Sequence, residues 1–299
     1  MSSSVLLNGQ VIDNRDAVIS VFDHGFLYGM GLFETFRTYG GGRPWLLERH
    51  AARLAAGCRA LGIDYVPDVG RMREGVAALL AANQLTDGYV RWSVSAGGAG
   101  AVGLPQGPYE APQEIVYAKA LAPDDPDSRP GKLLRLLQLR RNSAEAGPQA
   151  PRLKSFHYMN NILAKRELQA AGAGPGVEGL FLDGNDRVCE GTVSNVFWLS
   201  NGALYTPSTE TGALPGITRA YILEMSAETG IIVREGNYDV DELARADEVF
   251  LTNSVQEIVP VNAIEGEQGA VLREFPEAGS TTRAWMRQYR LRAERGEHG

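Results

Sequence analysis

The run Arg152-Leu153-Lys154-Ser155-Phe156-His157-Tyr158 decides how the rest of this chain is interpreted. It places a lysine between two apolar residues in a segment that carries little other charge. Apolar residues recur at helical spacing from Phe156 through Met159, Ile162 and Leu163, so we expect Lys154 to stand at the start of an amphipathic helix. Burial disfavours the charged form of an amine, and a desolvated lysine is suited to form an imine with an aldehyde. Most lysines are solvated surface groups, so this interpretation needs support from the remaining sequence.

Length and charge narrow the class of protein. A chain of 299 residues suits two modest domains, and a net charge of -7 argues against a nucleic-acid partner. Cys58 and Cys189 form no metal-ligand pattern and fit a reducing compartment. No secretory signal begins at Met1, and no apolar run is long enough to span a membrane. We therefore expect a cytoplasmic protein with no membrane partner, which binds a small anionic molecule through a local basic pocket.

The pattern of strands and helices predicts an α+β fold in two regions. A small region, residues 1–121, begins with a hairpin at Asn8-Gly9, and a segment rich in Pro and Asp at 122–131 is the predicted linker. The larger region, residues 132–299, alternates hairpins with helices. The elements expected with the clearest signals are helices over 48–61, 69–80 and 217–229, and strands over 32–39, 89–95, 114–120, 177–182, 187–190, 194–199, 204–206 and 248–252.

Two other kinds of site are not supported. Gly98-Ala99-Gly100-Ala101-Val102-Gly103 satisfies a dinucleotide-binding pattern, but the prolines that follow it, Pro105 and Pro108, cannot open the helix that a pyrophosphate needs. A flexible glycine loop near a ligand is the better interpretation. The four histidines lack paired ligand spacing, so we expect no metal.

Four segments in order carry a resemblance to a known family. The run from Arg152 continues as Tyr158-x-Asn160-Asn161-x-Leu163-Ala164-Lys165-Arg166-Glu167. It is followed by Gly179–Leu182 with Glu190–Phe197, by Tyr205–Pro207 with Gly212–Arg219, and by Asp247–Ser254 with Pro260-Val261. These segments resemble the lysine, glutamate and phosphate segments of the class IV aminotransferases and their lyase relatives, and the likeness extends from about residue 5 to residue 265.

The resemblance implies a two-domain, fold-type IV enzyme that uses pyridoxal 5'-phosphate. It implies a smaller α/β N-terminal domain, a larger C-terminal domain with a β-barrel-like sheet, and a homodimer with active sites between the domains. Lys154 would carry the cofactor and act as the catalytic base, and Glu190 would keep the pyridine nitrogen protonated. The phosphate would be held by Arg53, Ser254 and the helix start at Ile217 and Thr218, where backbone N–H groups suit an anion. Tyr158 would lie near the ring hydroxyl.

The N-terminal half bears on the substrate. The run Phe22–Arg37 and the triplet Arg140-Arg141-Asn142 resemble the bacterial 4-amino-4-deoxychorismate lyases of the family, which release pyruvate and form 4-aminobenzoate for folate biosynthesis. That likeness makes Thr35 a catalytic candidate near the departing group, and Arg91 and Asn253 candidates for binding the substrate. An arginine matches a carboxylate through two parallel hydrogen bonds.

Two alternatives stay open. D-amino-acid aminotransferases resemble the chain less, because their carboxylate-binding Arg and His would fall near Ala101 and Gly103. Branched-chain aminotransferases usually have Gly at the position of Thr35 but share the pattern Tyr89-Val90-Arg91. A more distant alternative is a non-catalytic binding protein on the same fold. It would have no need of a lysine, a glutamate and a phosphate-binding turn together.

Overall fold

The computed structural model describes residues 3–98, 103–105, 107–122, 124–142 and 150–297. The chain divides into two compact units. Unit 1 comprises Met1–Pro123, Leu153–His157 and Leu291–Gly299, and unit 2 comprises Asp124–Arg152 and Tyr158–Arg290. Residues 99–102, most of the predicted glycine loop, lie outside the described part of the chain.

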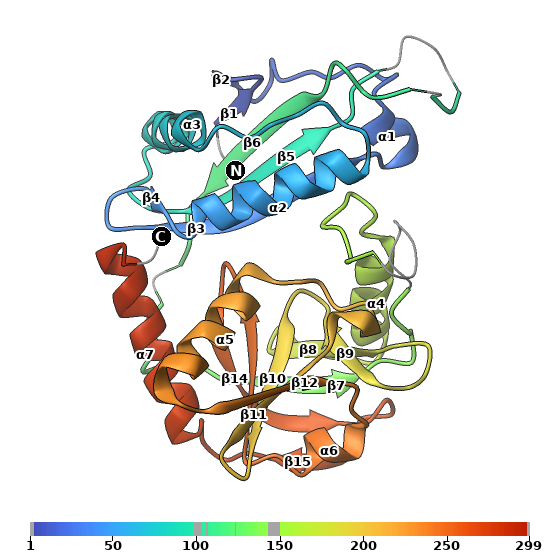
Figure 1. Ribbon diagram of the computed structural model, residues 1–299, viewed down its shortest axis with the longest axis vertical. Coiled ribbons are helices and arrows are strands. Elements are labelled where there is room, and N and C mark those ends of the chain that lie inside the picture. The colour runs from blue at the N-terminus through green and yellow to red at the C-terminus, as the bar shows by residue number, and fades with distance from the viewer. Residues whose placement is uncertain (1–2, 99–102, 106, 123, 143–149, 298–299) are drawn as a thin grey trace. The chain divides into compact units, whose positions relative to one another are not determined.

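Unit 1 is built on a six-stranded sheet in the order β2-β1-β6-β5-β3-β4, in which every neighbouring pair is antiparallel. The strands are β1 (Ser4–Leu7), β2 (Gln10–Asp13), β3 (Gly31–Tyr39), β4 (Arg43–Pro44), β5 (Tyr89–Ser95) and β6 (Gln113–Lys119). The helices are α1 (His24–Tyr28), α2 (Leu47–Ala60) and α3 (Val69–Ala82). Helix α2 packs against β3, and α3 contacts β1, β2, β4 and β6 (Figure 1).

The core of unit 1 follows from strand alternation. Leu32 and Phe36 of β3 and Val90, Trp92 and Val94 of β5 are buried together with the apolar residues of α2 and α3. The intervening residues of β3, including Phe33 and Thr35, point to the opposite face because side chains alternate along a strand. One face of β3 therefore builds the core, and the other is available to other groups.

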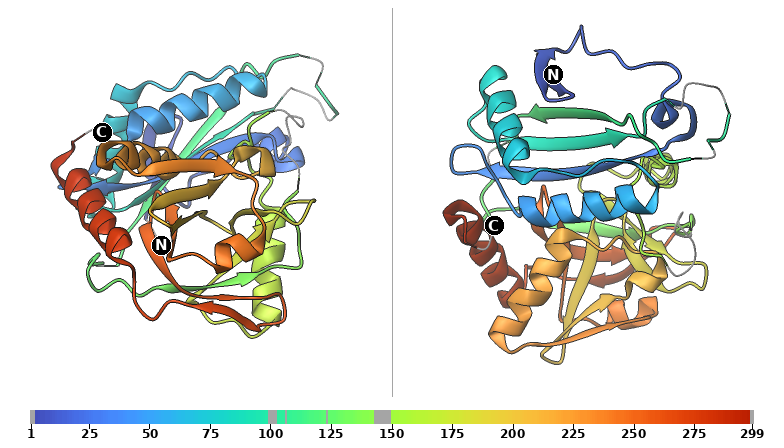
Figure 2. Two further views of the ribbon diagram at one scale, coloured as in Figure 1. Left: turned by 60° about the horizontal axis from the view of Figure 1, so that its bottom comes forward. Right: turned by 45° about the horizontal axis from the view of Figure 1, so that its top comes forward.

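Unit 2 contains a nine-stranded sheet in the order β12-β11-β10-β13-β14-β7-β8-β9, with β15 paired to β14. The strands are β7 (Lys132–Leu136), β8 (Val177–Leu182), β9 (Val188–Gly191), β10 (Asn195–Ser200), β11 (Ala203–Pro207), β12 (Ile232–Gly236), β13 (Glu248–Asn253), β14 (Glu257–Glu265) and β15 (Val271–Glu274). The sheet curls into a half-barrel (Figure 2), and it mixes antiparallel pairs with parallel pairs at β7–β8, β7–β14 and β11–β12.

The helical elements of unit 2 are α4 (Met159–Ala170), η1 (Thr209–Thr211), α5 (Ile217–Thr229) and α6 (Val240–Ala244), and α7 (Ser280–Arg295) continues into the last part of unit 1. Apolar residues from both halves of the sheet, among them Leu134, Val196, Trp198 and Leu251, form its core. A smaller cluster packs Ala164 and Leu168 of α4 against Phe181. The predicted α+β class, with a larger unit built on a curled, barrel-like sheet, is confirmed.

Two details differ from the sequence expectation. The segment around Lys154 belongs with unit 1 rather than with the larger region, because its backbone pairs with β3. Most of the stretch proposed as a linker belongs with unit 2, where Arg129 forms buried ion pairs.

Candidate active site

Lys154 lies on an extended segment that pairs with β3, not on a helix. Phe33 N donates to Lys154 O at 2.9 Å, and Phe156 N donates to Gly31 O at 3.0 Å. A β-carbon at Gly31 would lie 2.3 Å from the Phe156 ring, so only glycine allows the segment this close to the strand. The expectation that a helix starts at Lys154 was wrong. Helix α4 begins at Met159.

The side chain of Lys154 is half-buried and points to the face of β3 opposite the core. Its Nζ lies 4.6 Å from the centroid of the Phe33 ring, and the guanidinium carbon of Arg91 lies 3.7 Å from the same centroid. Thr35 is directly opposite Arg91 in the β3–β5 register. Opposed residues of an antiparallel pair share a face. The structure therefore brings Lys154, Arg91 and Thr35 to one face of unit 1.

The chain has four lysines: Lys119, Lys132, Lys154 and Lys165. Lys119 and Lys165 are exposed, and Lys132 Nζ lies 2.9 Å from Glu178 Oε2 in an ion pair. Lys154 is half-buried beside the Phe33 ring, on the face that also carries Arg91 and Thr35.

The core face of β3 carries a buried polar cluster. Arg53 on α2 donates from Nε and Nη2 to the two carboxylate oxygens of Glu34, at 2.8 and 2.6 Å. His50 Nδ1 lies 2.6 Å from Glu34 Oε2. Burial raises the pKa of Glu34, but Arg53 and His50 outweigh burial and lower it to about 2. Burial lowers the pKa of His50, so we assign a neutral imidazole that donates to an ionised Glu34. This bidentate pair fixes the direction of Arg53.

In unit 2, Glu190 is the residue before last of β9 and is almost completely buried. Its Oε2 accepts a hydrogen bond from Leu214 N at 2.9 Å. Its Oε1 lies 2.6 Å from Arg141 Nη2, but without the geometry of a hydrogen bond, and accepts none among the described residues. Glu190 Oε1 is therefore a buried acceptor that lies beside a guanidinium and receives no hydrogen bond from the described residues. This arrangement fits a carboxylate that receives an N–H from a pyridine ring.

Sequence reasoning missed two residues that hold the surroundings of Glu190. Arg141 donates from Nη1 to the amide oxygens of Asn160 and Asn161, at 2.9 and 3.1 Å. Glu178 accepts from Thr192 Oγ1, Val193 N and Ser194 Oγ, which form the turn after Glu190. The sequence showed Arg141 only within the triplet Arg140-Arg141-Asn142, without a role of its own, and Glu178 only as an ordinary charged position, because their partners are distant along the chain.

The start of α5 has the properties of an anion site. Its N-cap is Gly216, which provides no side-chain cap, so the first-turn N–H groups face outward from the helix end. A β-carbon at Gly216 would lie 2.1 Å from Asn195 Oδ1, so this close packing requires glycine. Thr218 Oγ1 lies 3.3 Å from Ser254 Oγ in the β13–β14 turn. Two predicted phosphate residues are thus brought together next to Ile217.

The positions of the two remaining candidates, Tyr158 and Asn253, do not by themselves indicate a contact with cofactor or substrate. Tyr158 is the half-buried N-cap residue of α4. Asn253 uses its side-chain oxygen inside its own turn, accepting from Val255 N at 2.9 Å and Gln256 N at 2.7 Å. In all, Lys154, Thr35, Arg53 and Arg91 belong to unit 1, whereas Glu190, Ile217, Thr218, Ser254, Tyr158 and Asn253 belong to unit 2. That these residues of the two units bind the same cofactor stays a prediction.

Comparison with known proteins identifies the family. Residues 31–264 match the model of amino-transferase class IV, and the chain belongs to this family. It is 42% identical over 264 residues to the aminodeoxychorismate lyase of Bacillus subtilis (strain 168), covering 87% of this chain and 86% of that protein. It is 36% identical over 262 residues to a putative branched-chain-amino-acid aminotransferase of Methanocaldococcus jannaschii, covering 88% of each.

Solved structures agree with this family. The 4-amino-4-deoxychorismate lyase from Pseudomonas aeruginosa matches with a TM-score of 0.80 and 31% identity, covering 97% of this chain and 99% of that one. A branched-chain aminotransferase from T.th., solved in complex with N-(5'-phosphopyridoxyl)-L-glutamate, matches with a TM-score of 0.84 and 26% identity, covering 100% and 96%. The cofactor of this chain is therefore pyridoxal 5'-phosphate, and the chain is an enzyme of the class IV family.

Within the part of the chain that the structure describes, no helix has both the length and the apolar character needed to cross a membrane.

Proposed function

We propose that this enzyme is a 4-amino-4-deoxychorismate lyase, which splits its substrate into 4-aminobenzoate and pyruvate. The observation that carries the proposal is the face of β3 where Lys154 Nζ and the Arg91 guanidinium lie beside the Phe33 ring, with Thr35 opposite Arg91. This face presents a nucleophilic amine, a carboxylate-binding cation and a hydroxyl, which are the three groups the reaction needs. The 42% identity to the Bacillus subtilis lyase supports the same choice.

Lys154 would hold the cofactor and later serve as the base. When bound, pyridoxal phosphate withdraws electrons from the carbon that bears the substrate's amine. Lys154 Nζ would take the proton from that carbon. The Arg91 guanidinium lies beside the same Phe33 ring as Nζ. Arg91 also binds a substrate carboxylate, and the Thr35 hydroxyl donates to the departing enolpyruvyl oxygen.

The residues of unit 2 would hold the two ends of the cofactor. Glu190 would accept the ring N–H at Oε1, the oxygen that lies beside Arg141 and has no hydrogen-bond partner among the described residues. The first turn of α5 with Thr218 and Ser254 binds the phosphate. From unit 1, Arg53 adds a guanidinium for the phosphate, aligned by its pair with Glu34.

A branched-chain aminotransferase is the second candidate, favoured by the 36% identity to the Methanocaldococcus jannaschii protein. The deciding experiment assays the purified protein with aminodeoxychorismate and, in parallel, with a panel of L- and D-amino acids and 2-oxoglutarate. The lyase proposal predicts release of 4-aminobenzoate and pyruvate, with transamination much slower. Fast transamination of leucine without pyruvate release from aminodeoxychorismate would overturn it. Absence of cofactor absorbance after addition of pyridoxal phosphate would favour a non-catalytic binding protein.

We also propose that the enzyme is a cytoplasmic homodimer. In support, α4 leaves Met159, Ile162 and Leu163 exposed, at 72%, 52% and 43%, although the sequence pattern assigned them to the apolar face of an amphipathic helix. Its buried residues are instead Asn161, Ala164 and Leu168. Val193, also 52% exposed, follows Thr192, whose carbonyl accepts from Asn161 Nδ2. An apolar group of this kind on one surface is typical of a protein interface.

A further inference from the structure

The turn between β13 and β14 ends in an unusual backbone conformation. Glu257, which opens β14, has a φ of 63°, in the left-handed region that residues other than glycine rarely adopt. Such a conformation is strained and persists only where the surroundings impose it. Ser254, the turn residue beside Thr218, lies three positions earlier. The conformation at Glu257 therefore helps to set the course of the backbone that carries Ser254.

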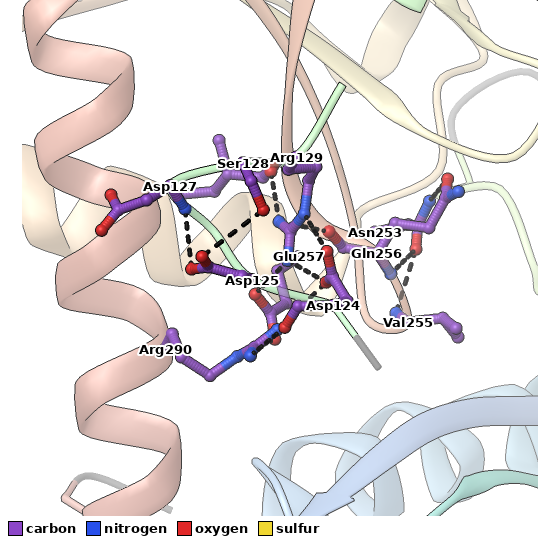
Figure 3. A network of polar contacts seen from close by, with 11 residues as sticks. Asp124, Asp125, Asp127, Ser128, Arg129, Asn253, Val255, Gln256, Glu257 and Arg290 are labelled. Atoms are coloured by element: carbon purple, nitrogen blue, oxygen red, sulfur yellow. Dashed lines mark hydrogen bonds and ion pairs between the residues drawn. The ribbon is translucent and has the colours of Figure 1, made fainter. Parts of the chain in front are cut away.

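Arg129 donates hydrogen bonds to three consecutive residues at this end of the turn (Figure 3). Its Nη1 donates to the carbonyl oxygens of Gln256 and Ile258, at 2.9 and 2.6 Å, and its Nη2 donates to Glu257 Oε2 at 2.9 Å. A planar guanidinium with several fixed donors is well suited to this task. These carbonyls belong to the residues before and after Glu257, so Arg129 holds the backbone on both sides of the left-handed residue.

Asp124 and Arg290 complete a buried network with Arg129 and Glu257 (Figure 3). Arg290 on α7 donates from Nε to Glu257 Oε1 at 2.8 Å and from Nη1 to Asp124 O at 2.8 Å. The Asp124 carboxylate accepts from both arginines. The side chains of Glu257, Arg129 and Arg290 are 0%, 6% and 12% exposed, and that of Asp124, at the edge of the network, is 26% exposed. Two carboxylates and two guanidinium groups balance in charge, which makes their burial tolerable.

A network of this kind is a weak source of stability, because the desolvation of four charges offsets much of their attraction. Its distinctive effect is geometric. Asn253 Oδ1 holds the first half of the turn by accepting hydrogen bonds from Val255 N and Gln256 N. The network holds the second half through Gln256 O, Glu257 and Ile258 O. Ser254 lies between these two anchors, with its hydroxyl beside that of Thr218.

We propose that the network of Asp124, Arg129, Glu257 and Arg290 is a positioning device for the phosphate contact of Ser254. It holds the β13–β14 turn so that the hydroxyl of Ser254 stays next to Thr218 and the first turn of α5. None of the four residues touches the phosphate in this assignment. The inference rests on the proposed phosphate site, and it adds four positioning residues that lie behind that site.

The test measures how much the phosphate group contributes to cofactor affinity, by comparing two aldehydes that differ only in that group. Cofactor is removed from the holoenzyme by dialysis against cysteine, and the protein is titrated with pyridoxal phosphate and, separately, with pyridoxal, which lacks the phosphate. Absorbance of the lysine-bound aldehyde reports each affinity. The ratio of the two affinities measures what the phosphate contributes. In Glu257→Gln, which keeps the shape but removes the charge, we expect this ratio to fall about tenfold, a coupling of about 1.4 kcal/mol.

Glu265→Gln is the matched control. It removes one carboxylate from the other end of β14, where Glu265 accepts from Arg135 Nε at 2.7 Å, and should leave the ratio within about twofold of wild type. If Glu257→Gln does not fold, the same titrations are made with Arg290→Met, which leaves Arg129 in place. A ratio unchanged in the folded variant, or lowered equally in Glu265→Gln, overturns the positioning role. A wild-type protein that binds neither aldehyde contradicts the proposed function instead.

Discussion

Arg141 Nη2 lies 2.6 Å from Glu190 Oε1, and the two side chains are only 4% and 5% exposed. A carboxylate buried to this degree needs a counter-ion to remain charged. Arg141 supplies it from a segment almost fifty residues earlier in the chain. The pair links the residue predicted to face the pyridine nitrogen with one that motif reasoning did not assign.

Arg141→Met should destabilise the protein by about 3–5 kcal/mol, because it leaves the buried charge of Glu190 without a partner. Urea unfolding measures the loss. Arg140→Met is the control, since Arg140 pairs with Asp186 and Glu267 at the surface and should cost less than about 1 kcal/mol. In the double variant Arg141→Met, Glu190→Gln, the loss should be smaller than the sum of the single losses. Additive losses would show that the two side chains do not stabilise each other.

Thr35→Val should lower pyruvate release about a hundredfold while the absorbance of bound cofactor stays as in wild type, because valine keeps the shape but cannot donate a proton. Thr35→Ser keeps a hydroxyl and should retain most of the activity. Steady-state assays of pyruvate release compare the three proteins. Wild-type activity in Thr35→Val would remove Thr35 from the catalytic group and weaken the case for the lyase.

Glu34→Gln tests the buried cluster with Arg53 and His50 through its pH dependence. The pKa of Glu34 is lowered from about 4.5 in the unfolded chain to about 2 in the folded protein. The ionised carboxylate therefore contributes its full stabilisation of the fold above pH 4.5 and loses it as the pH falls toward 2. We expect the free energy of unfolding of wild type to exceed that of the variant by roughly 3 kcal/mol near pH 6 and by much less near pH 3. Denaturant unfolding across this range measures the difference. A constant difference down to pH 3 would contradict the assignment.

Local signals in the sequence predicted much of this fold. Helix α5 begins and ends as expected, at Ile217 and Thr229, because Gly216 allows a tight start and Gly230 adopts the left-handed conformation (φ 71°) that ends a helix. The hairpins at Asn8-Gly9 and Asn201-Gly202 also form, with positive φ at all four residues.

Non-local contacts explain what the sequence did not reveal. Strand β7 was missed because it pairs in parallel with β8 and β14, which are distant in the chain. The segment at Lys154 was assigned to a helix because its apolar spacing is helical, yet pairing with β3 keeps it extended. Of the candidate site, the motifs indicated Lys154, Glu190 and Thr218. They did not indicate Arg141, Glu178 or Glu257, whose roles depend on partners that only the fold brings near.

Ile162→Glu should convert the proposed dimer into a monomer, because a charge in the centre of the exposed apolar group on α4 opposes burial between two copies. Sedimentation velocity distinguishes the two states. Val271→Glu, on β15 at a residue 56% exposed, introduces the same charge elsewhere and should leave the dimer intact. A wild-type protein that sediments as a monomer, or an Ile162→Glu protein that stays dimeric, would exclude this surface as the interface.

The central claim is that Lys154 carries pyridoxal phosphate, and reduction with borohydride followed by peptide mass spectrometry tests it directly. With four lysines in the chain, the assignment is unambiguous. We predict a phosphopyridoxyl group on the peptide that contains Lys154, and neither the label nor the visible absorbance in Lys154→Ala. A label on Lys119, Lys132 or Lys165, or no label in a wild-type protein saturated with pyridoxal phosphate, would contradict the account.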